Sequence, residues 1–211
     1  QSKEFPMKKV AIFLVALMVL VLQGLAYAGA PHQIAGIRLG APIEQYRDLI
    51  REDTRITVRH MRYISEVQMK PMDGYKSGYI YYGNCTSPGT IFKIKLKYLR
   101  DDKEFFNDLL ELFKGKFGKA SEYRGDAFGG YIAWKWSFTD EHKNKISLIL
   151  QHNSVDEEEY TSGNSVKLAI TTAMDKERQC YEAKYPGTSR GADTAQDQSK
   201  EIKDLKIFLP E

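Results

Sequence analysis

The sequence predicts an α+β fold, a two-layer sandwich in which helices pack against an antiparallel sheet. Two observations favour this class. A unit of one helix-like segment followed by several short strand-like segments occurs twice along the chain. Most of the strand-like segments also alternate apolar and polar residues, which is typical of a sheet that is covered on one side.

The first 28 residues have the pattern of a secretory leader. Two lysines after the first methionine precede an apolar run over 10–22, and Ala26-Tyr27-Ala28 presents small residues at the positions that a signal peptidase reads. We expect 1–28 to hold upstream residues and a cleaved signal peptide, which would leave no stable membrane anchor. The alternative is a retained anchor, because about 19 residues of this kind just span a bilayer.

Residues 29–186 contain enough apolar side chains for one core, so we expect a single α+β domain there. Residues 187–211 lack an aromatic side chain before Phe208, and we expect a disordered C-terminal tail. The formal charge of the whole chain is +3, but three lysines and one glutamate lie within 1–28. The mature chain is therefore nearly neutral, and a nucleic acid is not an expected partner.

The first predicted unit begins with a helix near Pro42, because proline is favoured in the first turn of a helix. Apolar residues recur at helical spacing on its buried face, namely Ile43, Tyr46, Leu49 and Ile50. Strands are expected to follow at 56–70, with a bend or an interruption, at 78–82 and at 90–99.

The second predicted unit begins with a helix at about 102–117, with Asp101 or Asp102 as its N-cap and Gly118 at its end. Its apolar stripe includes Phe106 and Phe113. The strands expected next lie at about 121–124, 131–139, 145–152 and 165–173, and a last helix is expected at 175–184.

The mature chain has two cysteines, Cys85 and Cys180. An isolated pair in an exported protein most often forms one structural disulfide. A disulfide between residues 85 and 180 would close a loop of about 95 residues. In the chain-entropy model such a bond stabilises the fold by up to roughly 4–5 kcal/mol. We therefore expect these two residues to be bonded to each other.

The segment Tyr131–Phe138 carries both tryptophans of the chain. Side chains alternate across a strand, so Trp134 and Trp136 share one face with Ile132 and Phe138. This face is expected to be core, and the alternative is an aromatic platform for a ligand. The same alternation predicts that Phe92, Ile94, Leu96 and Tyr98 lie on the core face of their strand.

The opposite face of the predicted sheet is rich in lysine and tyrosine. Its candidate binding residues are Lys93, Lys95, Lys97, Lys135, Lys167, Tyr79 and Tyr81. One explanation for these lysines is solubility, since exposed lysines discourage the aggregation of sheet faces. This explanation is favoured because lysine is depleted at the cores of protein interfaces. The other explanation is a binding surface for an acidic partner. The tyrosine-rich segment 75–85 likewise has two explanations. It is either an adaptable contact surface or a structural strand that the disulfide holds in place.

The sequence contains no catalytic motif that would assign a reaction. The four histidines do not have metal-ligand spacing, and the acidic run 156–159 lacks the spaced ligands and the glycine of a calcium loop. We therefore expect no catalytic residues, no metal site and no cofactor.

The segment I-A-G-I-R-L-G-A-P-I-E-Q-Y, Ile34 to Tyr46, resembles the entry of small exported bacterial domains of two types. These are the β-lactamase-inhibitor-like fold and the SmpA/OmlA-type outer-membrane lipoproteins. The chain departs from the lipoproteins because it has no lipid-anchor cysteine after the leader and because its domain is longer. The resemblance implies non-enzymatic binding of another protein through the exposed sheet face.

Together these observations predict a periplasmic or secreted bacterial protein, a non-catalytic binding module whose sheet face contacts a periplasmic or envelope protein. The alternative is a small-ligand carrier with an apolar pocket between sheet and helices. Such a pocket would be lined by Trp134, Trp136 and Phe106.

Overall fold

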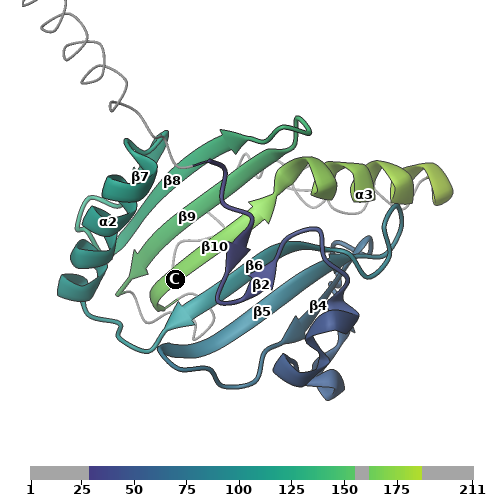
Figure 1. The fold of residues 1–211 in the computed structure, drawn as a ribbon, viewed down its shortest axis with the longest axis horizontal. Helices are drawn as coiled ribbons and strands as arrows, with labels where there is room; N and C mark the ends of the chain where they lie inside the picture. The colour runs from purple at the N-terminus through teal and green to yellow at the C-terminus, as the bar shows by residue number, and fades with distance from the viewer. Residues whose placement is uncertain (1–28, 155–161, 187–211) are drawn as a thin grey trace, which may run out of the picture.

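The computed structural model describes residues 29–154 and 162–186. This part of the chain has a mixed α+β fold that consists mostly of sheet (Figure 1). The predicted leader and the predicted C-terminal tail lie outside the described residues, so both stay predictions.

The strands of the large sheet are β3 (Ile56–Thr57), β4 (Ile64–Gln68), β5 (Tyr75–Gly83), β6 (Ile91–Tyr98), β7 (Glu122–Gly125), β8 (Tyr131–Thr139), β9 (Lys145–Asn153) and β10 (Gly163–Ile170). A small two-stranded sheet pairs β1 (Gln33–Ile34) with β2 (Ile37–Arg38). The helices are two 3-10 segments, η1 (Ile43–Leu49) and η2 (Glu52–Thr54), and two α-helices, α2 (Lys103–Phe117) and α3 (Thr171–Lys184).

The large sheet is antiparallel throughout, in the order β3-β4-β5-β6-β10-β9-β8-β7. Consecutive strands pair within β3–β6 and within β7–β10, and the two meanders meet where β6 pairs with β10. Strands β6 and β10 therefore lie at the centre of the sheet, with partners on both sides.

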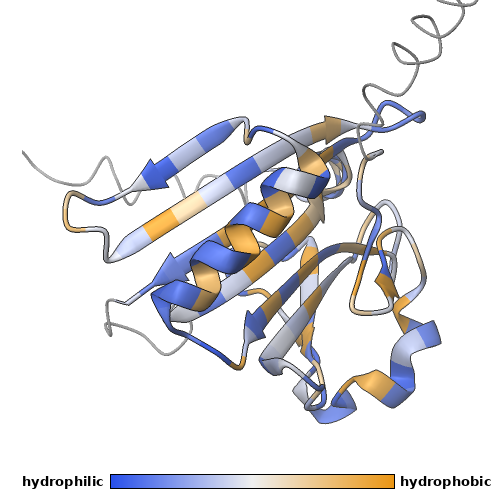
Figure 2. Cartoon of the chain, turned by 60° about the vertical axis from the view of Figure 1, so that its left-hand side comes forward, coloured by the Kyte–Doolittle hydropathy of each residue, from blue (hydrophilic) through white to orange (hydrophobic). Residues whose placement is uncertain are grey.

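The main core lies on the face that α2 covers. Figure 2 shows α2 crossing the sheet with alternating hydrophobic and hydrophilic positions. Trp136 is 2% exposed, and its indole N–H donates to the Gly118 carbonyl at 2.9 Å. Trp134 lies on the same face but is half-buried, and its ring contacts Tyr123 at a centroid distance of 4.7 Å. The expected placement of both tryptophans on the core face is confirmed.

Helix α2 begins and ends where the sequence predicts. The Asp102 carboxylate accepts a hydrogen bond from the Phe105 N–H at 2.8 Å, which is an N-cap. Gly118 follows the last turn with φ 73°, a conformation that favours glycine. The packed side chains Phe106, Leu110 and Phe117 join the main core.

One residue expected on the core face lies on the other face. Tyr81 pairs with Lys93 and Tyr82 pairs with Ile91, so Phe92 is an extra residue at a β-bulge. Because a bulge shifts the alternation, Phe92 packs beside Tyr81 in a second, smaller cluster. The prediction for Phe92 is therefore wrong, whereas Ile94 and the residues after it follow the expected alternation.

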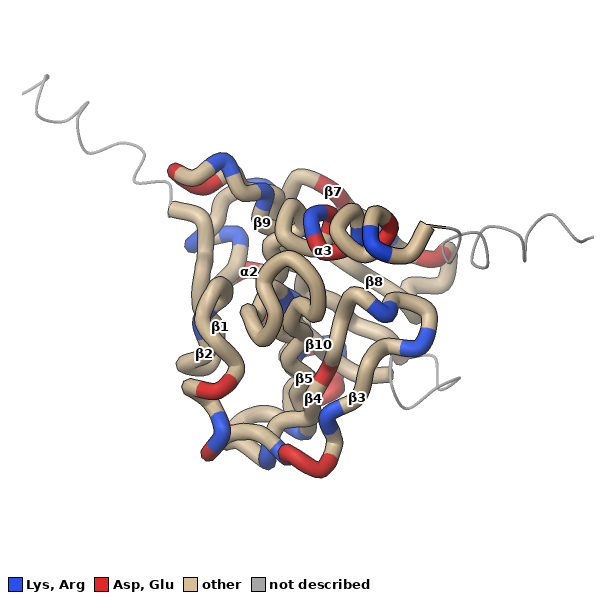
Figure 3. The backbone as a smooth tube through the Cα atoms, turned by 90° about the vertical axis from the view of Figure 1, so that its right-hand side faces the viewer, with Lys and Arg blue, Asp and Glu red and all other residues tan. Residues whose placement is uncertain are grey.

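Two helix predictions also need correction. The first predicted helix is a 3-10 segment with a kink at Tyr46, whose φ is −116°. The strand expected to reach residue 173 ends at Ile170, because helix α3 begins directly at Thr171. Ala173 and Met174 in its first turn contact the second cluster, so α2 and α3 lie against different faces and do not form one layer. Figure 3 shows α3 above the β3–β4–β5 side of the sheet.

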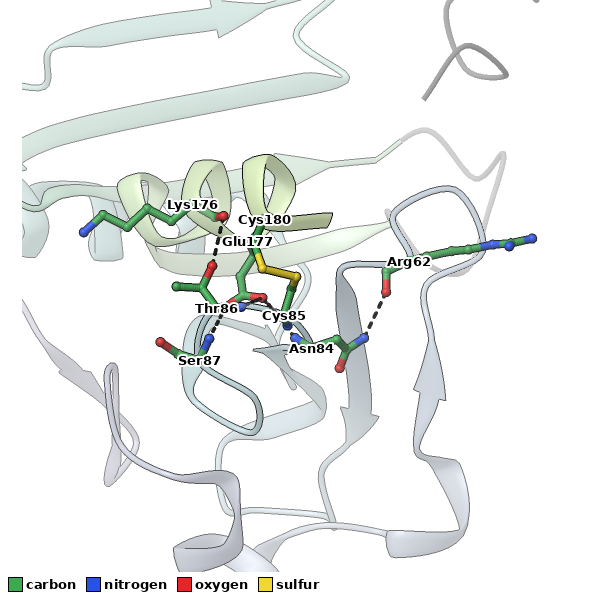
Figure 4. Close-up of a disulfide and its surroundings, with 8 residues drawn as sticks. All are labelled: Arg62, Asn84, Cys85, Thr86, Ser87, Lys176, Glu177 and Cys180. Carbon is green, nitrogen blue, oxygen red and sulfur yellow. Dashed lines mark hydrogen bonds between the residues drawn. A yellow bond between two sulfur atoms is a disulfide. The ribbon is translucent and has the colours of Figure 1, made fainter. Parts of the chain in front are cut away.

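The expected disulfide is present and joins α3 to the loop after β5. Cys85 and Cys180 are bonded, with their Cα atoms 5.9 Å apart (Figure 4). One turn before Cys180, Glu177 is 2% exposed, and its carboxylate accepts hydrogen bonds from four consecutive backbone N–H groups. The donors and their distances are Asn84 at 3.1 Å, Cys85 at 2.6 Å, Thr86 at 3.0 Å and Ser87 at 2.7 Å.

The residue before this loop has to be small. A Cβ atom added to Gly83 would lie 2.5 Å from the Glu177 carboxylate and 2.9 Å from the Ser87 carbonyl oxygen. The disulfide, the buried carboxylate and the glycine therefore form one junction that fixes α3 to the end of β5.

Candidate binding face

The predicted binding residues meet on one face of the large sheet, opposite α2, which we call the lysine face. The strand register aligns five positions in a row across five strands, namely Tyr79, Lys95, Lys167, Ile149 and Lys135. Lys93 and Lys97 lie two residues to either side of Lys95 on β6. All seven residues predicted from the sequence therefore share this face.

Several of these side chains contact one another or a polar neighbour. The Lys93 ammonium lies 4.2 Å from the centroid of the Tyr81 ring, a cation–π contact. The Lys167 ammonium donates to the Gln151 side-chain carbonyl at 2.8 Å. Lys135 at the far end of the row donates to the Glu122 carboxylate at 3.2 Å.

The centre of the lysine face is more buried than its alternating sequence predicts. Lys95 is 4% exposed, Lys97 is 6% exposed and Tyr81 is 4% exposed. Lys93, Lys135, Lys167 and Tyr79 are half-buried. The expectation of an exposed face is therefore wrong for its centre. Tyr81 is buried because it packs with Ile64 and Phe92 in the second cluster. Solubility alone does not explain lysines that water hardly reaches.

Burial and mutual repulsion change the proton affinity of these lysines. Burial, followed by the neighbouring charges of Lys167, Lys93 and Lys97, lowers the pKa of Lys95 to about 7. Burial also lowers the pKa of Lys93, with a further contribution from Lys167, and burial alone lowers the pKa of Lys167. Glu66 opposes the lowering of the pKa at Lys93 and Lys95.

A serine that sequence reasoning missed belongs to the same face. Ser165 pairs with Lys97 on one side and with Gln151 on the other, and it is 2% exposed. Among the described residues, its hydroxyl has no hydrogen-bond partner. Buried hydroxyls usually have such a partner, so this one is able to make a further polar contact. The only signal in the sequence is a small polar residue two positions before Lys167, on the same face of the strand.

The opposite side of the sheet has an apolar cavity of about 270 Å³ between α2, the N-terminal segment and the sheet. The alternative hypothesis from the sequence, a small-ligand carrier, places a pocket in this layer, lined by Trp134, Trp136 and Phe106. None of these three is among the described residues that line the cavity, because they pack within the core. The predicted lining of the pocket is therefore wrong.

Within residues 29–154 and 162–186, no three His, Cys, Asp or Glu side chains are grouped so that they would hold a metal ion. In the same part of the chain no helix has the length and apolar content to cross a membrane. A scan of protein-family models finds no match to the chain, and searches of curated proteins and of solved structures also find none.

Proposed function

We propose that this protein is an exported, non-catalytic binding module whose lysine face holds an acidic segment of another envelope protein. The observation that carries the proposal is a set of four neighbouring lysines, two of them buried, beside an unsatisfied serine hydroxyl. These residues are Lys93, Lys95, Lys97, Lys167 and Ser165.

The energetics of the face favour an anionic partner. Charged lysines that are buried next to one another cost free energy, and a carboxylate that approaches them removes part of this cost. A carboxylate oxygen also accepts a hydrogen bond from a hydroxyl such as that of Ser165. The loops that are seen in Figure 3 carry a mixture of acidic and basic residues, whereas Glu66 is the acidic residue that lies beside Tyr81 and Lys95 on the lysine face.

Two features support export. The Cys85–Cys180 disulfide is of a kind that persists in oxidising compartments. The pattern of 1–28 is that of a leader. Cell fractionation tests this part of the proposal: we expect the disulfide-bonded protein outside the cytoplasm, and recovery of reduced protein from the cytoplasm would contradict it.

The binding proposal predicts selective binding of an acidic peptide. We expect a peptide of eight glutamates to bind in calorimetry, and a peptide of eight glutamines to show no binding. Lys167→Glu should weaken the binding by about tenfold or more, because the new carboxylate neutralises Lys95 and repels the peptide. The fold should be retained, since the substitution reduces the repulsion between lysines.

Lys119→Glu is the matched control, because it changes the net charge equally at an exposed position outside the lysine face. Ser165→Ala supplies a second test: it should weaken the peptide without lowering the melting temperature, since it removes an unsatisfied hydroxyl. The proposed function would be overturned if the glutamate and glutamine peptides bound equally well. It would also be overturned if Lys167→Glu and Lys119→Glu lost the same amount of affinity for the glutamate peptide.

A further inference from the structure

The cavity under α2 has a closed apolar floor and a mouth that reaches solvent. Leu148 and Leu168 pair with each other on the neighbouring strands β9 and β10, and they are 3% and 1% exposed. At the other end of the cavity, Leu112 on α2 is 68% exposed. Figure 1 shows the N-terminal segment that contributes the remaining wall crossing in front of the strands.

The size of the cavity suits a small organic molecule. Its volume is about 270 Å³, and an apolar cavity of about 150 Å³ in another protein holds benzene. A chain of about eight carbon atoms therefore fits this volume, with one end at the mouth.

The polar side chains that line the cavity are few, namely Gln33, Tyr75, Tyr98 and Lys116. Tyr75 and Tyr98 stack at a centroid distance of 5.3 Å and line one side. Burial raises the pKa of both phenols, so their hydroxyls stay protonated at neutral pH. Lys116 lies at the exposed end, one helical turn after Leu112. A cation at the mouth of an apolar cavity favours a ligand with an apolar chain and one anionic end.

We propose that this cavity binds a small monocarboxylate with an unbranched apolar chain, with the chain against Leu148 and Leu168 and the carboxylate near Lys116. This site is on the opposite side of the sheet from the lysine face, so it is independent of the binding function proposed above. The ligand class follows from the apolar floor, the limited volume and the single cation at the mouth.

The test uses octanoate as the ligand and 1-octanol as its neutral analogue, with binding measured by calorimetry on the full chain. Octanoate should bind saturably and more tightly than 1-octanol. Lys116→Met should weaken octanoate by about fivefold, the usual effect of one exposed ion pair, and leave 1-octanol unchanged. Binding should also change the fluorescence of Trp136, because its ring lies 5.7 Å from that of Phe113 in the cavity wall.

Leu112→Trp fills the mouth at an exposed position where the fold tolerates a larger side chain, and it should weaken both ligands by about tenfold or more. Leu99→Trp is the matched control, because Leu99 is 67% exposed and does not line the cavity. The proposed site would be ruled out if octanoate showed no saturable binding. It would also be ruled out if Leu112→Trp and Leu99→Trp bound octanoate equally well. Equal affinity for octanoate and 1-octanol would overturn the assignment of an anionic ligand.

Discussion

Replacing Glu177 by glutamine should lower the free energy of unfolding by about 4 kcal/mol, one of the two largest effects expected for a single substitution in this chain. One carboxylate oxygen accepts from the N–H groups of Asn84, Cys85 and Thr86, and the other accepts from that of Ser87. A glutamine has one accepting oxygen, so its NH₂ group would face a backbone donor and leave that donor unsatisfied. The remaining hydrogen bonds would also lose their ionic character.

Urea unfolding of the oxidised protein measures this effect, with a thiol assay to show that the disulfide is intact. Glu182→Gln is the matched control, since it makes the same change on the same helix and its carboxylate makes no hydrogen bond within residues 29–154 and 162–186. We expect the control to change stability by less than about 0.5 kcal/mol. A loss below about 1 kcal/mol in Glu177→Gln would show that the disulfide alone fixes the junction.

The second large effect is a stability that rises with pH and depends on Lys95. Its pKa is about 7 in the folded protein, against 10.5 for a lysine that is exposed to water. Between these two values the unfolded chain binds more protons than the folded chain, so stability increases as the pH rises from 7 to about 10. The full contribution is on the order of 4 kcal/mol, and below pH 7 the buried charge costs this amount.

Lys95→Met should therefore be more stable than the wild type at pH 7, and the difference should disappear near pH 10. The other titratable groups on this face remain in the variant, namely Lys93, Lys97, Lys167, Glu66, Tyr79 and Tyr81, so the difference between the two proteins isolates Lys95. Lys119→Met, at an exposed site, is expected to show no such pH-dependent difference. Parallel stability curves for the wild type and Lys95→Met over this range would rule out a depressed pKa at Lys95.

Much of the sheet could be predicted because its signals are local. Alternation along one strand is sufficient to assign Trp136 to the core and Lys135 to the other face. The cap residue Asp102 and the terminal Gly118 likewise act within one turn of α2. Two cysteines in a chain with a leader pattern predict one bond without knowledge of the fold.

The rest depends on contacts between distant segments. Alternation fails at Phe92 because a bulge adds a residue, and no local signal marks the bulge. The burial of Lys95 is a property of the assembled sheet, in which β6 pairs with β10 far along the chain, and the alternation within β6 does not show it. Glu177 is one of three acidic residues in a polar helix, and only the loop that α3 meets gives it a structural role.

The chemistry of the lysine face depends on neighbours in the same way. The sequence predicts which lysines share a face, and the register shows that Lys95 and Lys167 are direct partners. It does not predict how far each is buried, and burial is the largest cause of the lowered pKa values. The unsatisfied hydroxyl of Ser165 is likewise visible only in the folded chain.

The most direct test of the lysine face is the pKa of the Lys95 ammonium, measured by NMR in protein labelled with ¹⁵N at the lysine Nζ atoms. In the protein alone the pKa is expected at about 7. With saturating glutamate peptide it should rise towards the ordinary lysine value, because a carboxylate beside the ammonium favours its charged form. A pKa that stays the same when the peptide is bound would contradict the claim that this face recognises acidic groups.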